Sequence, residues 1–538
     1  MTERTITCDV AIIGGSLGGV AAALAACRRN ATVLLASEVE WLGGQLTSQA
    51  VPPDEHPWIE SMGATASYRA LRDGIRDAYR TGFPLTDRAR DWAELNPGAG
   101  SVSKLCHEPR VAVDVIEQML RPHVAAGRLQ ILRNVVPVAA AAERDVVQRV
   151  TLRGPDGEEA AVTATYFIDA TELGDMLPLA GVEYVTGFES QADTDEPHAP
   201  ALAQPDNIQA LSWCFALDHV EGDHTIDRPE RYQFWRDLVP PTWPGPLLGF
   251  ASPHPRTDEP NIQTFVPNPG DDPFAMVADQ STNMADENLW LCRRLAARDV
   301  FRPGAYGSDI SLVNWSMIDY FLGSVIDVDE PTRAARLADA KQLGLSVLYW
   351  LQTDAPRPDG GTGWPGLRLR PDVVGTEDGF AQGPYYRESR RIRPLRRVLE
   401  QDLSLAVRGD RGAVHYPDSV GIGMYRIDLH PSTGGDGYID VGASPFEIPL
   451  GALIPERVQN VLAACKNIGT THITNGCYRL HPVEWNIGEV AGALAADCVA
   501  SGLVPHKVWE SEPALAEFQD RLTADGVPLR WPDGVRGY

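Results

Sequence analysis

The chain has 538 residues, of which 43% are hydrophobic and 22% charged, and its formal net charge is −26. This composition is typical of a globular protein with two or three domains, and it excludes a disordered or fibrous chain. The negative charge predicts that neither nucleic acid nor a membrane is a partner, because both attract clustered Lys and Arg.

The cysteines and the N-terminal segment indicate an intracellular setting. Eight cysteines are scattered along the chain, and no two have the C-x-x-C spacing of a redox pair or a zinc site. We therefore expect reduced thiols, no metal site and a cytoplasmic location. The uncharged stretch 10–27 approaches the length of a membrane span, but its four glycines and flanking charges favour a strand, a turn and a helix. We identify no targeting segment.

The first forty residues predict a nucleotide-binding βαβ unit. Residues 5–15 read as a buried parallel strand, 17–30 as a helix of small residues, and 31–38 as a second strand ending at Glu38. The connecting sequence GGSLGG matches the G-x-G-x-x-G fingerprint except at Ser16. We expect the helix N-terminus to bind a pyrophosphate, the Ser16 hydroxyl to donate to a phosphate, and Glu38 to bind ribose hydroxyls. An ordinary strand–helix turn is the alternative.

The rest of the chain predicts a nucleotide domain interrupted by a second domain. A helix over 107–127 precedes β-rich runs over 129–171, which indicate a β-meander with a PDG turn at 155–157 and a strand that returns to the first sheet. Residues 190–410 are rich in Pro, Trp and Asp, and strand-then-helix patterns return at 458–469 and 486–502. We therefore predict an α/β fold: a Rossmann-like domain of 1–189 and 411–500 with a parallel sheet and β-meander crossover, a mixed α+β substrate domain of 190–410, and a C-terminal extension of 501–538.

Several segments resemble one flavoprotein family. The segments DVAIIGGSLGGVAAALAA (9–26) and VLLASEVEWLGGQLTSQ (33–49) resemble the N-terminus of FAD-dependent oxidoreductases of the glutathione-reductase-like superfamily. YFIDATELGDMLPLAGVEY (166–184) is similar to their returning strand, although Glu172 stands where many carry a glycine. YYRESRRI (385–392), DSVGIGMYRIDLH (418–430) and residues 448–492 narrow the resemblance to the FAD-dependent oxidoreductase family with an R-E-S-R-R-I signature.

The resemblance implies a non-covalently bound FAD. A second glycine fingerprint for NAD(P)H is absent from the sequence, which favours FAD over a nicotinamide cofactor. Together, the fingerprint and the resemblance assign these residues to the cofactor: Gly14, Gly15, Ser16, Gly18, Gly19, Glu38, Gly43, Gly44, Gln45, Val135, Ala170, Asp175, Asn467, Glu484, Asn486 and Ile487. In such proteins the helix that begins near Pro482 points its N-terminus at the flavin, where reduction builds negative charge.

The catalytic candidates lie in the matched C-terminal segments. A substrate dehydrogenation needs a proton acceptor, and His430, His472 and His481 are the candidates, although a lone histidine is more often a satisfied hydrogen-bonding group. On a strand, Arg387, Ser389 and Arg391 of RESRRI would share one face. We expect an arginine of this signature, with Arg391 as the candidate, and Arg479 to bind substrate or stabilise charge. A solvated or interdomain ion-pair cluster is the alternative for RESRRI.

The expected function is that of an oxidoreductase. We expect FAD to remove hydride from a C–H bond next to oxygen or nitrogen in a small organic substrate, with O2 or another acceptor reoxidising the flavin. An NAD(P)H-dependent flavin monooxygenase is the alternative, and a non-catalytic FAD-stabilised binding protein is a third. A small-molecule substrate is the expected partner, and a homo-oligomer is compatible with the sequence.

Overall fold

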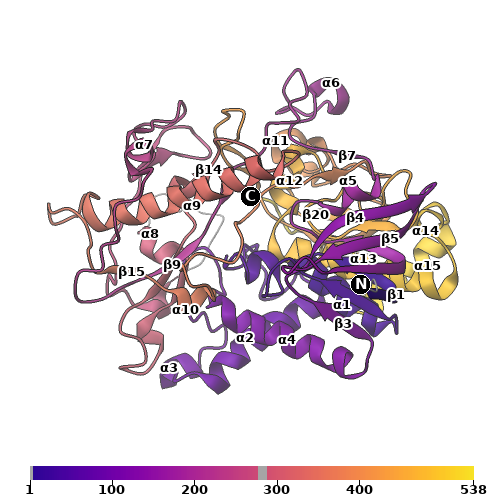
Figure 1. Ribbon diagram of the computed structural model, residues 1–538, viewed down its shortest axis with the longest axis horizontal. Helices are drawn as coiled ribbons and strands as arrows, with labels where there is room; N and C mark the ends of the chain where they lie inside the picture. Colours follow the sequence, from indigo (N-terminus) through magenta and orange to yellow (C-terminus); the bar gives the residue numbers. More distant parts are fainter. Residues whose placement is uncertain (1–3, 277–287) are drawn as a thin grey trace.

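The computed structural model describes residues 4–276 and 288–538, and its main sheet contains strands from both ends of the chain (Figure 1). The strand order is β3-β2-β1-β6-β5-β4, and β21 pairs with β6. The strands of this sheet are β1 (Arg4–Ile13), β2 (Val33–Ala36), β3 (Leu129–Leu132), β4 (Val136–Glu143), β5 (Val146–Arg153), β6 (Glu159–Asp169) and β21 (Val461–Ala463). The C-terminal strand therefore completes a sheet that the N-terminal strands begin.

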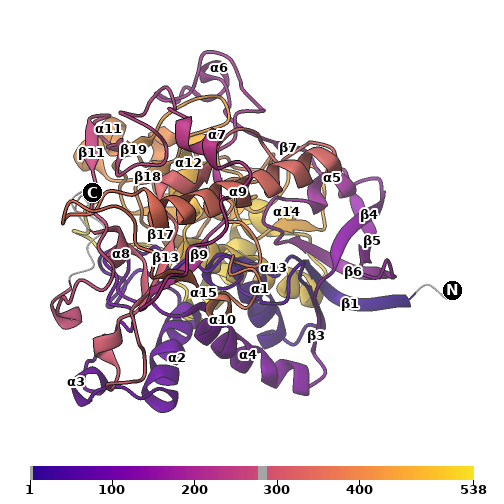
Figure 2. The same cartoon turned by 60° about the vertical axis from the view of Figure 1, so that its left-hand side comes forward.

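The N-terminal βαβ unit is confirmed. β1 lies parallel to β2 and to β6, and α1 (Leu17–Arg28) begins after the glycine turn. The N-terminal half of β1 pairs with β6 but extends beyond β2, as Figure 2 shows at the end of the molecule marked N. β2 ends two residues before Glu38, which leaves that side chain beyond the sheet edge. The adjoining turn and Glu38 thus lie at the carboxyl ends of parallel strands, where ligands bind in such sheets.

The β-meander is confirmed with one difference. β4, β5 and β6 are antiparallel neighbours, and Gly157 in the β5–β6 turn has φ +79°. β3, which we predicted to belong to the β-rich region, instead pairs in parallel with β2 at the sheet edge. α4 (Pro109–Ala125) returns the chain to that edge before β3 begins, so the crossover geometry makes a parallel pair.

Helices α1 and α13 (His481–Ser501) pack with their backbones in contact. A Cβ atom on Gly488 would lie 2.0 Å from the carbonyl oxygen of Gly18, and one on Gly492 would lie 2.1 Å from that of Ala22. These two glycines therefore allow α13 to pack closely on the first βαβ unit. The contact brings the N-terminus of α13 beside the N-terminus of α1.

The Gly492→Ala variant is expected to lower the free energy of unfolding by about 1–3 kcal/mol, because the added methyl group has no room beside a backbone carbonyl. Chemical denaturation followed by circular dichroism measures the change. Gly82→Ala is the control: Gly82 ends α2 (Ala66–Gly82) with nothing within 4 Å of its Cβ position, so this variant should be neutral or slightly stabilising. Equal losses in the two variants would contradict the helix–helix contact.

The central part of the chain has its own aromatic core. An antiparallel sheet with the order β12-β13-β9-β15 packs against the long helix α9 (Glu330–Thr353). Its strands are β9 (Phe215–His219), β12 (Arg294–Ala296), β13 (Ile310–Val313) and β15 (Leu367–Leu369). Trp235, Trp290 and Trp350 are buried in this core. The mixed α+β character is as expected, whereas the domain boundaries remain predictions.

Shorter elements connect these parts. The remaining helices are α3 (Asp87–Arg90), α5 (Met176–Ala180), α6 (Gln191–Thr194), α7 (Tyr232–Asp237), α8 (Leu289–Cys292), α10 (Pro371–Val374), α11 (Leu405–Arg408), α12 (His472–Tyr478), α14 (Pro505–Glu510) and α15 (Glu512–Ala524). The remaining strands are β7 (Tyr184–Val185), β8 (Leu211–Ser212), β10 (Ala251–Pro253), β11 (Pro260–Ile262), β14 (Asp319–Tyr320), β16 (Arg391–Ile392), β17 (Ser419–Gly423), β18 (Ile427–Leu429), β19 (Ile439–Val441) and β20 (Phe446–Pro449).

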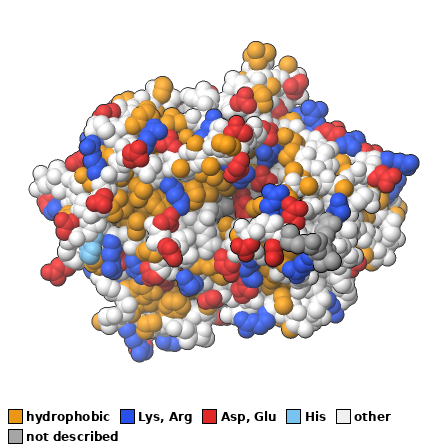
Figure 3. Space-filling view, in the orientation of Figure 1, with side chains coloured by type: hydrophobic (Ala, Val, Ile, Leu, Met, Phe, Trp, Pro, Cys, Tyr) orange, Lys and Arg blue, Asp and Glu red, His pale blue; other side chains and the backbone are white. Residues whose placement is uncertain are grey.

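The surface mixes the two signs of charge. On the face in Figure 3, basic side chains are interspersed with acidic ones, and apolar side chains gather over α7 and α9. Within residues 4–276 and 288–538, no helix has both the length and the apolar character that crossing a membrane requires. All eight cysteines are free thiols, as the sequence predicts.

Candidate active site

The glycine turn between β1 and α1 is too tightly packed for any other residue at Gly14. Gly14 has φ +118°, and a Cβ atom there would lie 2.1 Å from the backbone of Ala170 at the end of β6. A Cβ atom on Gly15 would lie 2.4 Å from the hydroxyl of Ser37 at the end of β2. The turn is therefore held between two strand ends, with its backbone at the sheet edge.

Three backbone N–H groups of this turn are left for an anion. The N–H groups of Gly15, Ser16 and Leu17 are buried, and they donate to no acceptor in the described part of the chain. The N–H of Gly18 donates to Glu484 Oε1 at 3.1 Å, and that of Gly19 donates to Ser16 Oγ at 3.2 Å. Ser16 is thus the N-cap of α1, a role that the sequence analysis missed. The three remaining donors at the helix N-terminus fit a phosphate.

Glu38 borders the recess beside this turn. Its carboxylate is accessible to water, yet the surrounding protein and the carboxylates of Asp175 and Glu172 raise its pKa to about 7. The recess is also lined by Gly14, Ser16, Gly44 and neighbouring residues, and its volume is about 20 Å³.

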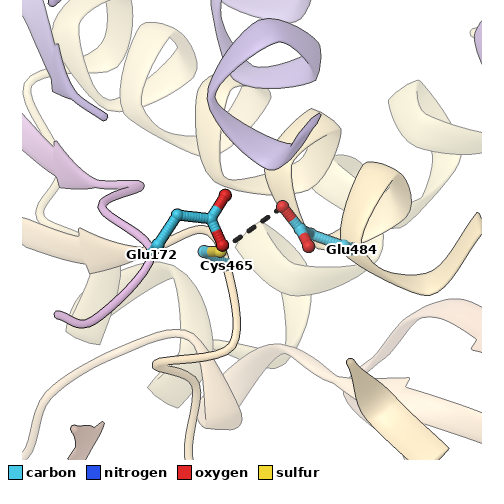
Figure 4. A group of neighbouring side chains, drawn as sticks. All are labelled: Glu172, Cys465 and Glu484. Atoms are coloured by element: carbon cyan, nitrogen blue, oxygen red, sulfur yellow. Dashed lines mark hydrogen bonds between the residues drawn. The ribbon is translucent and has the colours of Figure 1, made fainter. Parts of the chain in front are cut away.

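A buried charged cluster lies between the two helix N-termini (Figure 4). Glu172 follows β6, Cys465 and Lys466 follow β21, and Glu484 lies in the first turn of α13. The Lys466 ammonium forms an ion pair with Glu172 and lies 3.7 Å from Glu484 Oε2. Cys465 Sγ donates to Glu484 Oε1 at 3.3 Å, and Gln45 Nε2 donates to Glu484 Oε2. The Glu484 carboxylate thus accepts from the Gly18 N–H in the first turn of α1 and itself lies in the first turn of α13. The dipoles of both helices favour a negative charge at this position.

The protonation of this cluster does not suit a metal ion. The ligand atoms of Glu172, Cys465 and Glu484 lie within 4.8 Å of one another. Burial lowers the pKa of Lys466, but the neighbouring Cys465, Glu172 and Glu484 outweigh burial and hold that pKa well above its usual value. Burial also raises the pKa of the Cys465 thiol, so it keeps its proton. The ammonium already balances the carboxylates, and a protonated thiol is a poor metal ligand.

A second cavity has a volume of about 250 Å³ and is lined mostly by residues of the segments 254–316 and 425–440. Its wall includes a hairpin of β18 and β19, in which Asp428 and Asp440 are directly opposite, and His430 follows β18. The lining residues are Val102, His254, Pro255, Arg256, Asn261, Gln263, Leu289, Cys292, Arg293, Asn314, Trp315, Ser316, Tyr425, Arg426, Asp428, His430, Tyr438, Asp440 and Tyr538. Such a cavity is large enough for a small organic molecule.

His430 is oriented by a buried carboxylate. Its Nδ1–H donates to Asp319 Oδ2 at 2.6 Å, so Nε2 is the nitrogen that remains for chemistry in the cavity, 3.7 Å from Asp428 Oδ2. Asp319 also accepts from Ser212 Oγ at 2.6 Å and lies 3.0 Å from Arg387 Nη2. Burial raises the pKa of Asp319, but Arg387 and His430 outweigh it and lower the pKa below its usual value. An ionised carboxylate that fixes the imidazole tautomer is the arrangement of a general base.

The cavity and the charged cluster are linked through Arg479. Its Nη1 donates to the Tyr385 hydroxyl at 2.7 Å, its Nη2 donates to Asp428 Oδ2 at 3.2 Å, and its carbonyl accepts from Gln45 Nε2 at 3.0 Å. Arg479 therefore contacts the cavity wall through Asp428 rather than lining the cavity itself.

Two of the three predicted histidines lie in the interior. His481 Nδ1 accepts from the N–H of Asp54 at 3.0 Å, and its Nε2–H donates to Val51 O at 3.2 Å. Burial holds its pKa well below the usual value, so it is neutral with both nitrogens engaged. His472 stacks on Phe188 at 3.7 Å and donates to Glu388 at 3.0 Å. Of the three, His430 is the one that lines the cavity.

The RESRRI segment differs from the expected strand. Only Arg391 and Ile392 are in a strand, β16, so the predicted alternation of faces is wrong. Arg391 is buried, with its guanidinium bonded to Glu388, Glu189 and the carbonyl oxygen of Gly187. The backbone before β16 is irregular, and this lets Arg387 contact Asp319 while Arg391 joins a separate buried network. Arg387, rather than Arg391, contacts the Asp319 carboxylate that binds His430 in the cavity wall.

The other predicted cofactor residues divide into two groups. Val135 donates from its N–H to Ser37 O at 2.9 Å, Asn467 donates to Asp169 O at 3.0 Å, and Asp175 pairs with Arg390 at 3.0 Å. These three border the carboxyl ends of β2 and β6, as do Gly43 and Gly44 of the following turn. By contrast, Asn486 Oδ1 accepts from Ile422 N at 3.3 Å in β17, and Ile487 is buried in the core. Lys466 is a functional-site residue that was not predicted, and its signal is a single charge inside the apolar run VLAACKNIG.

Comparison with protein-family models identifies the family of this chain. The family model for FAD dependent oxidoreductases matches residues 9–522. This chain belongs to the FAD-dependent oxidoreductase family. Its Rossmann-like fold and its cofactor, FAD, are those that the sequence predicts. No curated protein matches the sequence of this family member.

Solved structures match this FAD-dependent oxidoreductase over part of the chain. An L-proline dehydrogenase from P. horikoshii is 17% identical over 36% of this chain and 26% of its own, with a TM-score of 0.17. The anhydrotetracycline hydroxylase OxyS from Streptomyces rimosus is 15% identical over 42% and 39%, with a TM-score of 0.22. The flavin-dependent monooxygenase PieE, solved in complex with FAD and substrate, is 17% identical over 40% and 35%, with a TM-score of 0.25. The chain spans less than half the length of each.

Replacing Glu38 with alanine is expected to weaken FAD binding by about 10–100-fold, because a charged hydrogen bond to the ribose is lost. Fluorescence titration of the FAD-free protein measures the dissociation constant. Glu40→Ala, two residues away and exposed, is the control and should bind FAD normally. Unchanged affinity in Glu38→Ala would contradict the ribose assignment.

Proposed function

We propose that the protein oxidises a small organic substrate at a C–H bond next to oxygen or nitrogen, with His430 as the general base. The observation that carries this proposal is the His430–Asp319 pair in the wall of the 250 Å³ cavity. Bound FAD would supply the acceptor for the hydride, and O2 or another oxidant would restore it.

The chain offers groups for each part of the cofactor. The free N–H groups of Gly15, Ser16 and Leu17 fit the pyrophosphate, and Glu38 fits the adenosine ribose. The N-terminus of α13, which lies close to Gln45 and Arg479, is suited to the ring end, where negative charge develops on reduction. The glycine turn with its unpartnered donors is the structural support for FAD at this edge of the sheet.

The side chains in the cavity wall suggest where the substrate proton goes. The hydroxyl or amine hydrogen of the substrate goes to His430 Nε2 as the adjacent C–H bond breaks, and the carbon becomes doubly bonded to that oxygen or nitrogen. Asp319 stabilises the imidazolium that forms, and Arg387 keeps Asp319 ionised and in place. Asp428, 3.7 Å from Nε2, adds a second negative charge beside the developing cation.

Anaerobic mixing tests the proposal. The FAD-loaded protein is mixed with candidate alcohols and amines, or with NADPH alone, and the flavin absorbance near its visible maximum is followed. Bleaching by an alcohol or amine without NADPH is the expected result. Bleaching by NADPH but by none of the organic compounds would favour the monooxygenase and overturn the proposal, as would a protein that binds no FAD.

A further inference from the structure

We propose that the substrate is a neutral polyhydroxylated compound of monosaccharide size, oxidised at one of its hydroxyl groups. This inference rests on the proposed function, because it assigns a substrate class to the cavity that contains His430. The cavity's volume of about 250 Å³ limits the ligand to a small molecule.

The charges in the cavity wall are already matched. Arg293 Nη1 lies 3.2 Å from Asp54 Oδ1, and Arg479 Nη2 lies 3.2 Å from Asp428 Oδ2. An ammonium entering near His430 would therefore meet carboxylates whose charge is balanced by arginines. An incoming carboxylate would lie beside Asp319 and Asp428, which flank the imidazole, and would be repelled. A substrate with an ammonium or a carboxylate group therefore finds no unpaired charge of opposite sign near His430.

Two arginines in the cavity wall share one carboxylate. Arg256 and Arg426 both pair with Asp440, at 3.0 Å for Arg256. The Arg256 side chain is 30% exposed, so water screens its charge. Because both arginines are paired with Asp440 and Arg256 is screened by water, they give a charged substrate little advantage over a neutral one.

Neutral polar groups in the wall are available for hydroxyl groups. The side-chain amides of Asn261 and Gln263 form no hydrogen bond with any described residue. Asn314 Oδ1 and Trp315 Nε1 are buried and have no partner among the described residues. Amides both donate and accept, as hydroxyl groups do, whereas a hydrocarbon would leave these groups without a partner.

Aromatic rings complete a surface suited to a sugar-like ring. Tyr425, Tyr438 and Trp315 line the cavity, and the Tyr438 ring lies 5.4 Å from the His430 ring, edge to face. The C–H face of a polyhydroxylated ring can pack on such rings while its hydroxyl groups bond to the amides. In the reaction, the carbinol C–H hydrogen would leave with its electron pair as hydride, for which bound FAD would be the acceptor, the O–H proton would go to His430 Nε2, and the carbinol would become a ketone or aldehyde.

The test compares neutral and charged forms of the same ring. Isothermal titration of the FAD-loaded protein under argon uses D-glucose, D-galactose, D-mannose and myo-inositol, together with D-glucuronate, D-galacturonate, D-glucosamine and D-galactosamine. We expect at least one neutral member to bind about tenfold more tightly than its acid and amine counterparts. Tighter binding of a charged counterpart, or no neutral member binding below about 10 mM, would overturn the inference.

A tryptophan pair gives a matched control. Trp315→Phe removes one indole N–H from the cavity wall and is expected to weaken binding of the neutral ligand by about 2–10-fold. Trp243 also has a buried, unpartnered indole N–H but does not line the cavity, so Trp243→Phe should bind normally. Equal effects in the two variants would count against recognition in this cavity.

The readouts separate this inference from the proposed function. If neutral members bind but no compound bleaches the flavin, the substrate class stands and the proposed oxidation fails. If only an acid or an amine bleaches the flavin, the oxidation stands and the substrate class is wrong.

Discussion

The His430→Asn variant should reduce the bound flavin about 10²–10⁴-fold more slowly than the parent protein, because the proton acceptor is lost. FAD occupancy should not change, since His430 lies in the cavity wall rather than at the glycine turn. Anaerobic stopped-flow absorbance with a reactive alcohol or amine measures the rate.

His415 gives a matched control for this variant. It also donates from Nδ1 to a carboxylate, at 2.7 Å from Glu447 Oε1, but its side chain is 77% exposed and lies outside the cavity. His415→Asn should therefore reduce flavin at the parent rate. A rate in His430→Asn within about threefold of the parent would rule out general-base catalysis by this histidine.

The Asp319→Asn variant tests whether Asp319 positions His430 for catalysis or only stabilises the fold. The amide of the variant carries no negative charge, so it no longer fixes His430 Nδ1 as the protonated nitrogen. The variant should therefore reduce flavin more slowly and with an altered pH profile. If Asp319 matters only for stability, the folded variant would keep the parental rate and pH profile. That result would remove Asp319 from the proposed proton path.

The Lys466→Met variant should lose about 3–5 kcal/mol of unfolding free energy, because it leaves two buried carboxylates without their counter-ion. Lys466 is 3% exposed, and its ammonium contacts Glu172 and Glu484. Denaturation in urea, with and without FAD, measures the loss. Lys507→Met removes an exposed partner of Glu510 and should cost no more than about 1 kcal/mol.

The deficit of Lys466→Met should shrink as the pH falls. Burial and the nearby Glu172 raise the pKa of Glu484 in the folded protein, while Lys466 lowers it. Without Lys466 that pKa rises further, so the folded state binds more protons than the unfolded state. Stability then increases toward acidic pH. A loss that is independent of pH would mean that packing, rather than charge, is the cause.

The elements that the sequence predicted well are those with local signals. The first βαβ unit is marked by a glycine turn between apolar runs, and α13 by Pro482 in its first turn followed by small residues. These patterns depend on neighbours in the sequence, so they can be identified without the fold. The same holds for the PDG turn between β5 and β6.

The site depends on contacts that no local pattern contains. The bond from Gly18 to Glu484 joins residues 466 positions apart, and Asp319 reaches His430 from a strand 111 residues away. The sequence could place three histidines in matched segments, but only tertiary packing decides that His481 and His472 are engaged in the interior. The irregular backbone of RESRRI could not be read from its sequence, and it decides that Arg387 contacts Asp319 whereas Arg391 joins a separate buried network.

The pairing of β21 with β6 also constrains the order of events during synthesis. β1 to β6 and the glycine turn leave the ribosome long before β21 and α13, which supply the last neighbour of β6 and the Glu484 cap of α1. We therefore expect the nascent N-terminal half to remain incompletely folded, with an exposed sheet edge, until the C-terminal segment arrives. FAD would then bind late, as a ligand of the finished chain, and would stabilise it by mass action.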